Sequence, residues 1–472
     1  MKKKFLICCA CLLVISCNKI TDLNVDPKNP STAPSYAFFT NAERNLSNAL
    51  TAANRSLNIF RLIMQYWQQT ISPNESNYIL SISNVNEEVW NFLYRDVLRD
   101  FRECKNLMPF DVADTSVRKN QLAIADIMEV MTYYYLVTTY GNIPYTEALD
   151  IENPFPVYDD AKTIYNDLLR RLDVDIALMN IGFGSFGSAD IIYGGDVSNW
   201  LKFANSFKLK MALTIADEDN IKAKAAAEEA MAAGVFTSNA DNAEFHYLTS
   251  PPNTNPVWVN LVLNGSTPFV AASTIIDEMK FLNDPRLDNY FTEDANGDYS
   301  GGTPGANSNY AAFSKPDETI TIPDFPALLL GYAEVEFLLA EAIERGYNVG
   351  GTAALHYNNA ITASVMYWGG NTTEVAAYIS QPSVNYSSAT NYKHKIGIQK
   401  WIALYNKGWD AWIEWRRLDY PQLSPAIHAV SDIPVRYPYP VNEQNVNRTN
   451  YEQAAAAIGG DFVSTKLWWD IY

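Results

Sequence analysis

Cysteine and histidine are scarce in this chain of 472 residues. Four of its five cysteines lie within the first seventeen residues, and only Cys104 lies beyond them. If Cys8, Cys9 and Cys11 leave with a cleaved N-terminal segment and Cys17 is acylated, the single remaining thiol excludes an internal disulfide and a zinc site built from cysteines. The four histidines are far apart and never form the HExxH pattern of zinc enzymes. An exported chain without disulfides must rely on its hydrophobic core, and this one is long enough to do so.

Positive charge is also in short supply. The chain has 35 Lys and Arg against 53 Asp and Glu, a formal net charge of −18, and no basic cluster occurs past residue 4. Such a surface repels phosphate backbones, so we expect no nucleic-acid partner. Loss of residues 1–16 would remove three lysines and bring the side-chain balance to −21.

Long apolar runs are absent from the body of the chain, which therefore lacks a segment long enough to span a membrane as a helix. The N-terminus has an apolar run of eleven residues, 5–15, behind three lysines, which is typical of a secretory signal. The following Ser16-Cys17 resembles the lipobox of bacterial lipoproteins, in which the cysteine is acylated. We predict a signal peptide over residues 1–16 and a lipid anchor at Cys17, followed by a Pro-punctuated tether over 17–35. The alternative is an ordinary signal peptide with an incidental cysteine.

Helical periodicity is abundant, whereas strand-like alternation is scarce and short. The segment 161–176, for example, has apolar residues at steps of three and four. The periodic segments form pairs, which cover residues 121–140 and 158–179, 199–216 and 221–233, and 332–344 and 352–367. Small residues in the last pair, with Gly346 at the end of its first helix, favour close packing of the two helices. We predict a mainly all-α fold of tetratricopeptide-like hairpins, with generic helix packing as the alternative.

Length alone suggests about three domains, but helical arrays run longer as single units. We therefore expect residues 36–472 to form one domain. Between the helix pairs lie long segments without periodicity, over 180–198, 245–274, 281–326 and 371–392. Loops of this length in a compact protein are usually functional, so we expect the ligand site on them.

Several motifs along the chain have the order found in one family. They include DLNVDPKNPSTAP (22–34), YYYLVTTYGNIPYTEAL (133–149), YAEVEFLLAEAIERGY (332–347) and KWIALYNKGWDAWIEWRRLDYP (400–421). In this order the chain resembles the SusD/RagB family of outer-membrane nutrient-binding lipoproteins of Bacteroidetes, in its SusD-like branch. One departure is that Asn18-Lys19-Ile20-Thr21 follows Cys17, where surface-exposed lipoproteins of these bacteria often have acidic residues.

The resemblance implies a helical scaffold whose irregular loops hold a nutrient oligosaccharide. It also implies a location on the outer membrane, facing the cell exterior, and a TonB-dependent SusC-like transporter as the partner that receives the ligand. Peptide cargo on the same architecture is an alternative that the sequence leaves open.

Aromatic residues make up 13% of the chain, with 29 Tyr and 11 Trp. A neutral glycan is gripped by aromatic faces and by amides, carboxylates and backbone groups that meet its hydroxyls. The aromatic residues that we select as ligand-binding candidates lie on the loops: Tyr78, Trp258, Tyr299 and Tyr310. A core role that anchors its loop is the alternative for Trp258. By contrast, we expect a single helix to hold Trp401, Trp409, Trp412 and Trp415 in the core.

The segment DANGDYSGG begins like a calcium-binding loop, with Asp294, Asn296 and Asp298 at alternate positions. The twelfth position of such a loop would be a glutamate, but here it is Gly305. Turn chemistry accounts for the same residues without an ion. We therefore predict no cofactor and keep these three residues as weak calcium candidates.

No catalytic motif stands out. The chain lacks GxSxG, a P-loop and a dinucleotide fingerprint. Asp410 and Glu414 are one helical turn apart and could be nominated as the carboxylate pair of a glycoside hydrolase, but Arg416 and Arg417 adjoin them, which favours a structural ion network. We expect a binding protein and not an enzyme, with a surface glycoside hydrolase as the less favoured alternative.

Overall fold

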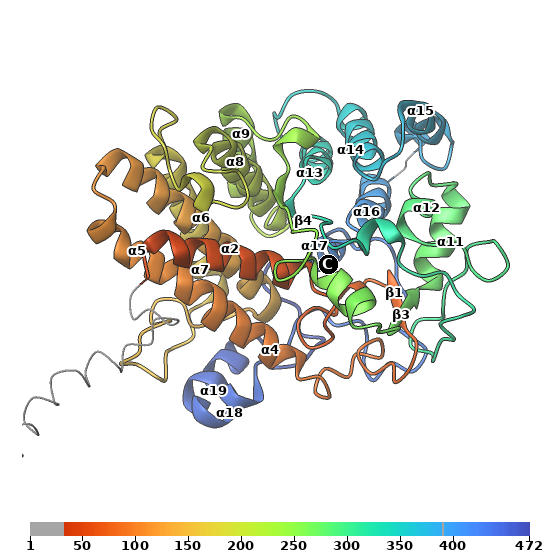
Figure 1. Ribbon diagram of the computed structural model, residues 1–472, viewed down its shortest axis with the longest axis horizontal. Helices are drawn as coiled ribbons and strands as arrows, with labels where there is room; N and C mark the ends of the chain where they lie inside the picture. Colours follow the sequence, from red (N-terminus) through yellow and green to blue (C-terminus); the bar gives the residue numbers. More distant parts are fainter. Residues whose placement is uncertain (1–32, 389–390) are drawn as a thin grey trace, which may run out of the picture.

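The computed structural model describes residues 33–388 and 391–472, and helices dominate them (Figure 1). The predicted mainly α-helical fold is confirmed. The predicted signal peptide, the lipidation site Cys17 and residues 17–32 of the predicted tether lie outside the described residues. Within those residues, no helix is long and apolar enough to cross a membrane.

The helices of the first half of the chain, in order, are α2 (Ser35–Thr51), α3 (Phe60–Ile63), α4 (Val85–Phe92), the π-helix η3 (Leu93–Leu98), α5 (Arg99–Asp111), α6 (Thr115–Tyr140), α7 (Ala161–Leu178), α8 (Val197–Thr214) and α9 (Asn220–Ala233). The helices of the second half are α10 (Pro256–Trp258), the π-helix η6 (Val259–Leu263), α11 (Ser273–Leu282), α12 (Leu287–Tyr290), α13 (Tyr332–Glu344), α14 (Ala353–Tyr367), α15 (Thr372–Ser380), α16 (Tyr392–Ala403), α17 (Gly408–Leu418), α18 (Val441–Val446) and α19 (Arg448–Ala457).

The strands are short and form two antiparallel pairs. In one pair, β1 (Trp67–Gln69) lies against β3 (Phe269–Ala271), with Gln68 opposite Val270. In the other, β2 (Ala243–Phe245) lies against β4 (Ala327–Leu330), and the register shifts between Ala243 and Glu244. Both pairs join segments that are far apart in the sequence, so they fasten the loops to the helical scaffold.

The three predicted helix pairs are confirmed as α6 with α7, α8 with α9, and α13 with α14. Figure 1 shows the last two pairs next to each other along the upper edge of the molecule. Aspartates that accept backbone N–H groups begin α6, α7, α8 and α9. After α13, Gly346 has a φ of +78° and its N–H donates to the Ile343 carbonyl, so this glycine ends the helix as predicted.

We predicted a single helix for the segment that holds the four tryptophans, but the structure has two helices there, α16 and α17. The chain turns between α16 and α17, where Arg61 donates through Nη2 to the carbonyl and the side-chain oxygen of Asn406. A Cβ on Gly408 would lie 2.7 Å from the Arg61 backbone nitrogen, so only glycine allows α3 to approach this closely. The turn that separates α16 from α17 depends on a contact with Arg61, 345 residues earlier in the chain, and helical periodicity cannot predict such a contact.

Most of the tryptophans belong to the core, as predicted. Phe60 stacks on Trp409 and on Tyr437, with ring centroids 4.6 and 5.2 Å apart. Trp401, Trp409 and Trp412 are at most 3% exposed. Trp415 differs, because it is only half-buried.

Buried charges join α8, α13 and α17 at the centre of the molecule. Lys210 lies 2.8 Å from Glu334 and also pairs with Asp410, while Lys407 pairs with the same two carboxylates at 2.7 and 3.1 Å. Burial alone would lower the pKa of Lys210, but the charges of Asp410 and Glu334 outweigh it and hold that pKa well above its ordinary value. Lys210 is therefore a buried cation that depends on its two carboxylate partners.

The neighbouring Glu414 belongs to a second buried group of charges, in which it pairs with Lys400 at 2.8 Å and with Arg417. The expected structural ion network around Asp410 and Glu414 is thus confirmed for Arg417. The expectation that Arg416 joins this network is wrong, because its guanidinium donates to backbone carbonyls and forms no ion pair within the described residues.

A buried carboxyl on α2 makes stability depend on pH. Glu43 is completely buried, and its Oε2 accepts the Ile191 N–H at 3.1 Å. Burial first, and then the charge of Asp190, raise the pKa of Glu43 well above its ordinary 4.5. The folded state holds the proton of the Glu43 carboxyl more firmly than the unfolded chain does. The stability that this protonated carboxyl contributes is therefore fully present below about pH 4.5 and is lost as the pH rises through the folded-state pKa.

We therefore expect Glu43→Gln, which keeps the shape and removes the charge, to gain stability relative to the parent as the pH rises from about 4 to about 8. Urea unfolding across that range measures the difference. Glu452→Gln on exposed α19 is the matched control and should follow the parent at every pH. A constant difference between Glu43→Gln and the parent would contradict the raised pKa of Glu43.

Candidate functional site

A groove with a volume of about 440 Å³ lies beside the C-terminal end of α2. Its walls come from α2 and the loop after it, from the end of α4, and from the segment around α10 and η6. The residues that line it are Asn45, Asn48, Ala52, Ala53, Asn54, Leu57, Phe92, Thr254, Pro256, Val259, Asn260 and Asn264. Five of them are asparagines and none is charged, so the groove offers neutral amides above a partly apolar floor.

The amides of the groove are only partly engaged by the protein. Asn45 donates from its side-chain NH₂ group to the Asp96 carbonyl at 2.9 Å. Asn48 accepts the Tyr247 hydroxyl at 2.9 Å, which leaves its NH₂ group as a donor. The side-chain oxygen of Asn260 is buried and has no hydrogen-bond partner within the described residues. An amide has both donors and an acceptor, so these groups suit a ligand whose hydroxyls do the same.

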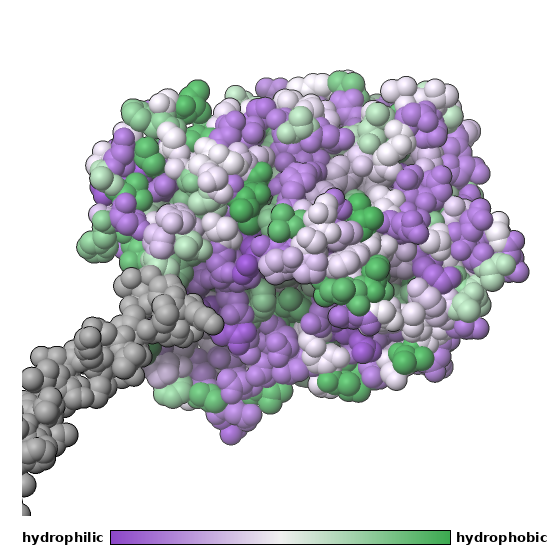
Figure 2. Space-filling model, in the orientation of Figure 1, coloured by the Kyte–Doolittle hydropathy of each residue, from purple (hydrophilic) through white to green (hydrophobic). Residues whose placement is uncertain are grey.

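Trp258 lies next to this groove in the chain, between the lining residues Pro256 and Val259. Its side chain is half-buried, and no ring pair or hydrogen bond of its indole is present among the described residues. The π-helix η6 follows directly, and such turns are frequent at functional sites. Val262 and Leu263 on η6 are 49% and 53% exposed. Figure 2 shows several separate apolar groups among polar ones on the face that Figure 1 presents.

The other predicted ligand-binding residues do not share this groove. Tyr78 is only 3% exposed, because its loop folds inward and its hydroxyl accepts the Ala426 N–H at 3.3 Å. Its expected place on an accessible loop surface is therefore wrong. Tyr299 is half-buried against the core, whereas Tyr310 is 36% exposed with the Lys315 ammonium 5.1 Å from its ring centre. Within the described residues, no ring pair or hydrogen bond joins any two of the four.

The segment with the weak calcium candidates forms a turn held by its own groups. Asp294 accepts the Asn296 N–H at 2.7 Å and the Ser300 hydroxyl at 2.6 Å. Asp298 pairs with Lys280 at 2.8 Å. No group of three His, Cys, Asp or Glu side chains that could hold a metal occurs in residues 33–388 and 391–472. Turn chemistry accounts for the geometry of Asp294, Asn296 and Asp298, and the lack of a cofactor stays a prediction.

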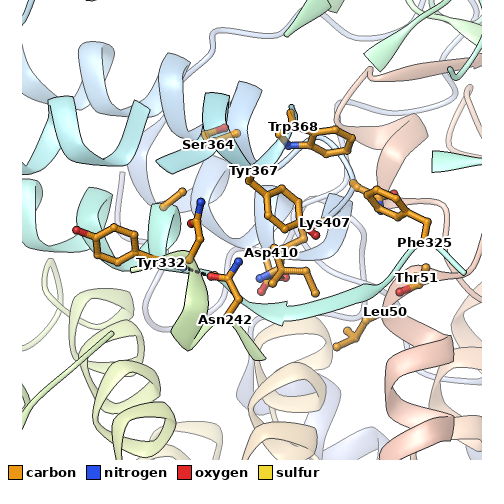
Figure 3. Close-up of a pocket in the computed structure, with 16 residues that line it drawn as sticks. Leu50, Thr51, Asn242, Phe325, Tyr332, Ser364, Tyr367, Trp368, Lys407 and Asp410 are labelled. Carbon is orange, nitrogen blue, oxygen red and sulfur yellow. Dashed lines mark hydrogen bonds and ion pairs between the residues drawn. The ribbon is translucent and has the colours of Figure 1, made fainter. Parts of the chain in front are cut away.

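A second cavity lies between β4, α14 and α17 and is drawn in Figure 3. Tyr367, Trp368, Lys407 and Asp410 lie around it, and the Tyr332 N–H donates to Asn242 at its edge. Its volume of about 40 Å³ has room for little more than a water molecule. It is too small for a sugar and borders the buried charges, so the groove beside α2 is the better ligand site.

Residues 27–440 of the chain match the model of the SusD-like family that is described as starch-binding and associating with the outer membrane. The chain belongs to this SusD-like family. The family is one of binding proteins, which agrees with the absence of carboxylates from the lining of the groove beside α2. No match is found among curated proteins.

Solved structures share the fold of this SusD-like protein. A chitin-binding protein is 26% identical with a TM-score of 0.81, and the match covers 93% of this chain and 100% of that one. A SusD homolog from Bacteroides uniformis is 26% identical with a TM-score of 0.78, covering 92% and 100%. A chitin-binding SusD homolog from Flavobacterium johnsoniae is 24% identical with a TM-score of 0.81, covering 93% and 98%, and supports the fold.

None of the residues that line the groove of this SusD-like protein was selected from the sequence, and the selected residue nearest to them in the chain is Trp258. Trp258 stands in NTNPVWVN, where proline and asparagine signal a loop. The asparagines of the groove were missed, because they come from two regions about 200 residues apart and single asparagines are common in loops. A scan for neutral amides around the selected tryptophan would have found Asn260 and Asn264, but not Asn45 or Asn48.

Proposed function

We propose that this SusD-like protein captures a neutral nutrient oligosaccharide in the groove beside α2 and delivers it to a TonB-dependent SusC-like transporter. The observation that carries the proposal is the lining of the groove, which has five asparagines and no charged side chain. Sugar hydroxyls donate and accept hydrogen bonds, as amides do. The half-buried indole of Trp258, between the lining residues Pro256 and Val259 in the chain, would supply an apolar face for a sugar ring.

The same lining bears on the two alternatives. A peptide has charged termini and side chains, for which the groove holds no counter-charge. Glycoside hydrolysis needs two carboxylic acids across the scissile bond, and the groove has none. The location that we propose is the outer membrane, with a lipid on Cys17 as the anchor and the groove open to the cell exterior. The family description, which associates these proteins with the outer membrane, supports that location.

Calorimetry with the lipidated protein in detergent tests the binding function. Chitin and starch oligosaccharides are the first probes, because one similar structure is a chitin-binding protein and the family is described as starch-binding. We expect binding to at least one of them without release of reducing ends over time. Retention of peptides alone would favour the peptide alternative, and new reducing ends would favour a hydrolase. Co-purification of the transporter from the native membrane tests delivery.

A further inference from the structure

A separate hollow, with a volume of about 420 Å³, lies where the C-terminal end of α17 meets the segments 422–435 and 466–470. It shares no lining residue with the groove beside α2. Its polar lining includes Gln422, Asp419 and Asp432, and Leu423, Ile433 and Val435 make part of it apolar. The mixture of apolar and polar groups in one concave surface is typical of a small-ligand site.

An indole forms part of this surface. Trp415 is the one member of the four tryptophans on α16 and α17 that the fold leaves half-buried, and it lines the hollow. Its Nε1–H donates to the Pro421 carbonyl at 2.9 Å, so the ring is held in place. A fixed and partly accessible indole is a suitable platform for the C–H face of a sugar.

Two deeply buried charged side chains behind the indole have unused hydrogen-bonding atoms. Arg416 is 3% exposed and donates to the carbonyls of Trp412, Thr138 and Val435, while its Nη2 has no partner within the described residues. Asp470 is 4% exposed, and its Oδ1 accepts from Lys466 at 3.2 Å while its Oδ2 has no partner there.

Leaving such buried atoms unpaired is unfavourable, so a partner is expected. Both side chains line the hollow. Burial lowers the pKa of Arg416 to about 9 and raises that of Asp470, as expected for groups cut off from water. A hydroxyl can accept from the guanidinium and donate to the carboxylate, which a purely anionic or purely cationic group cannot do.

We propose that this hollow is a second saccharide-binding site, in which a neutral sugar ring lies on Trp415 and its hydroxyls meet the polar lining residues Arg416, Gln422, Asp432 and Asp470. The inference rests on the proposed function, because it assumes that the protein handles glycans. Three aspartates against one lysine and one arginine give the hollow a net negative charge, which disfavours carboxylated or sulfated sugars. Two sites on one protein would raise its avidity for a polysaccharide chain that reaches both.

Calorimetry with chitohexaose and maltohexaose on the full lipidated protein tests the inference through stoichiometry. We expect two sites per chain for the hexasaccharide that binds. Gln422→Ala and Asp432→Ala change exposed residues that the fold does not need, and each should weaken one site by about tenfold and leave the other unchanged. Trp415→Ala should remove the same site. Gln453→Ala, on exposed α19, is the matched control and should bind as the parent does.

The outcomes separate the two proposals. One site per chain, weakened by Asn260→Ala and unaffected by Gln422→Ala, Asp432→Ala and Trp415→Ala, would overturn the second site and leave the proposed function intact. Failure of both hexasaccharides and of wider neutral glycan panels to bind would overturn the proposed function and the second site together. If Trp415→Ala fails to fold, the Gln422→Ala and Asp432→Ala variants decide the test, because both of these residues are exposed.

Discussion

Lys210→Met is expected to destabilise the protein by about 3–5 kcal/mol. The Lys210 ammonium is completely buried between Glu334 and Asp410. Methionine fills much of the same space, but it leaves two buried carboxylates with Lys407 as the ammonium that they share. The loss is large because an uncompensated charge in the interior costs more than the ion pair itself contributes.

Unfolding in guanidinium chloride at neutral pH measures this effect as a fall in the midpoint at unchanged slope. Asp410→Asn combined with Lys210→Met should lose less than the sum of the two single changes, since the two side chains share one interaction. The exposed pair of Arg448 with Glu452 on α19 is the matched control, and Arg448→Met should leave the midpoint unchanged. A Lys210→Met variant as stable as the parent would show that the buried carboxylates find protons or water instead.

Trp258→Ala is expected to weaken binding of the neutral oligosaccharide in the groove by about 2 kcal/mol, which is about thirtyfold in Kd. The indole is half-buried, Trp258 stands in the chain between the groove residues Pro256 and Val259, and no described residue forms a ring pair with it. On the proposed function, this indole contributes mainly to ligand binding. Because the side chain is only half-buried, the free energy of unfolding should change less than the affinity.

Calorimetry of the Trp258 variants with chitin and starch oligosaccharides gives the affinities. Trp258→Tyr keeps a flat apolar face and should retain most of the binding, whereas Trp258→Ala should not. Phe110→Ala serves as the control, because Phe110 is an aromatic residue 87% exposed on α5 that lines neither hollow. If Trp258→Ala binds as tightly as the parent while Asn260→Ala loses binding, the groove would still be the ligand site, but Trp258 would not contribute to it.

Helix positions were the most predictable part of the fold. The segment predicted over 332–344 is α13, Tyr332–Glu344, and the one over 352–367 differs from α14 by one residue at its start. Apolar spacing, an N-terminal cap and a terminating glycine are all local, so the sequence around a helix contains them. The turn between α16 and α17 was not predictable, because it depends on Arg61 reaching Asn406.

The candidate site was less predictable than the fold. Aromatic content drew attention to the loops, but it could not tell an accessible ring from one that folds inward. Trp258 is half-buried and adjoins groove residues in the chain, whereas Tyr78 turns inward to Ala426. Trp415, predicted as a core residue, lines a hollow instead of being fully enclosed. Exposure depends on which distant segments cover a side chain, and helical spacing contains no information on that.

The sequence by itself determined the family and the helix pairs. Its low content of cysteine and of positive charge also excludes disulfides and disfavours nucleic acids as partners. These properties depend on composition, local spacing and the order of motifs. The tertiary structure alone decided how the buried charges pair, which tryptophans are accessible, and which polar residues meet. Asn45 and Asn260 become neighbours in one groove only because the loop at 254–264 packs against the end of α2. The physical reason is that a binding surface is made of long-range contacts, whereas a helix is made of short-range ones.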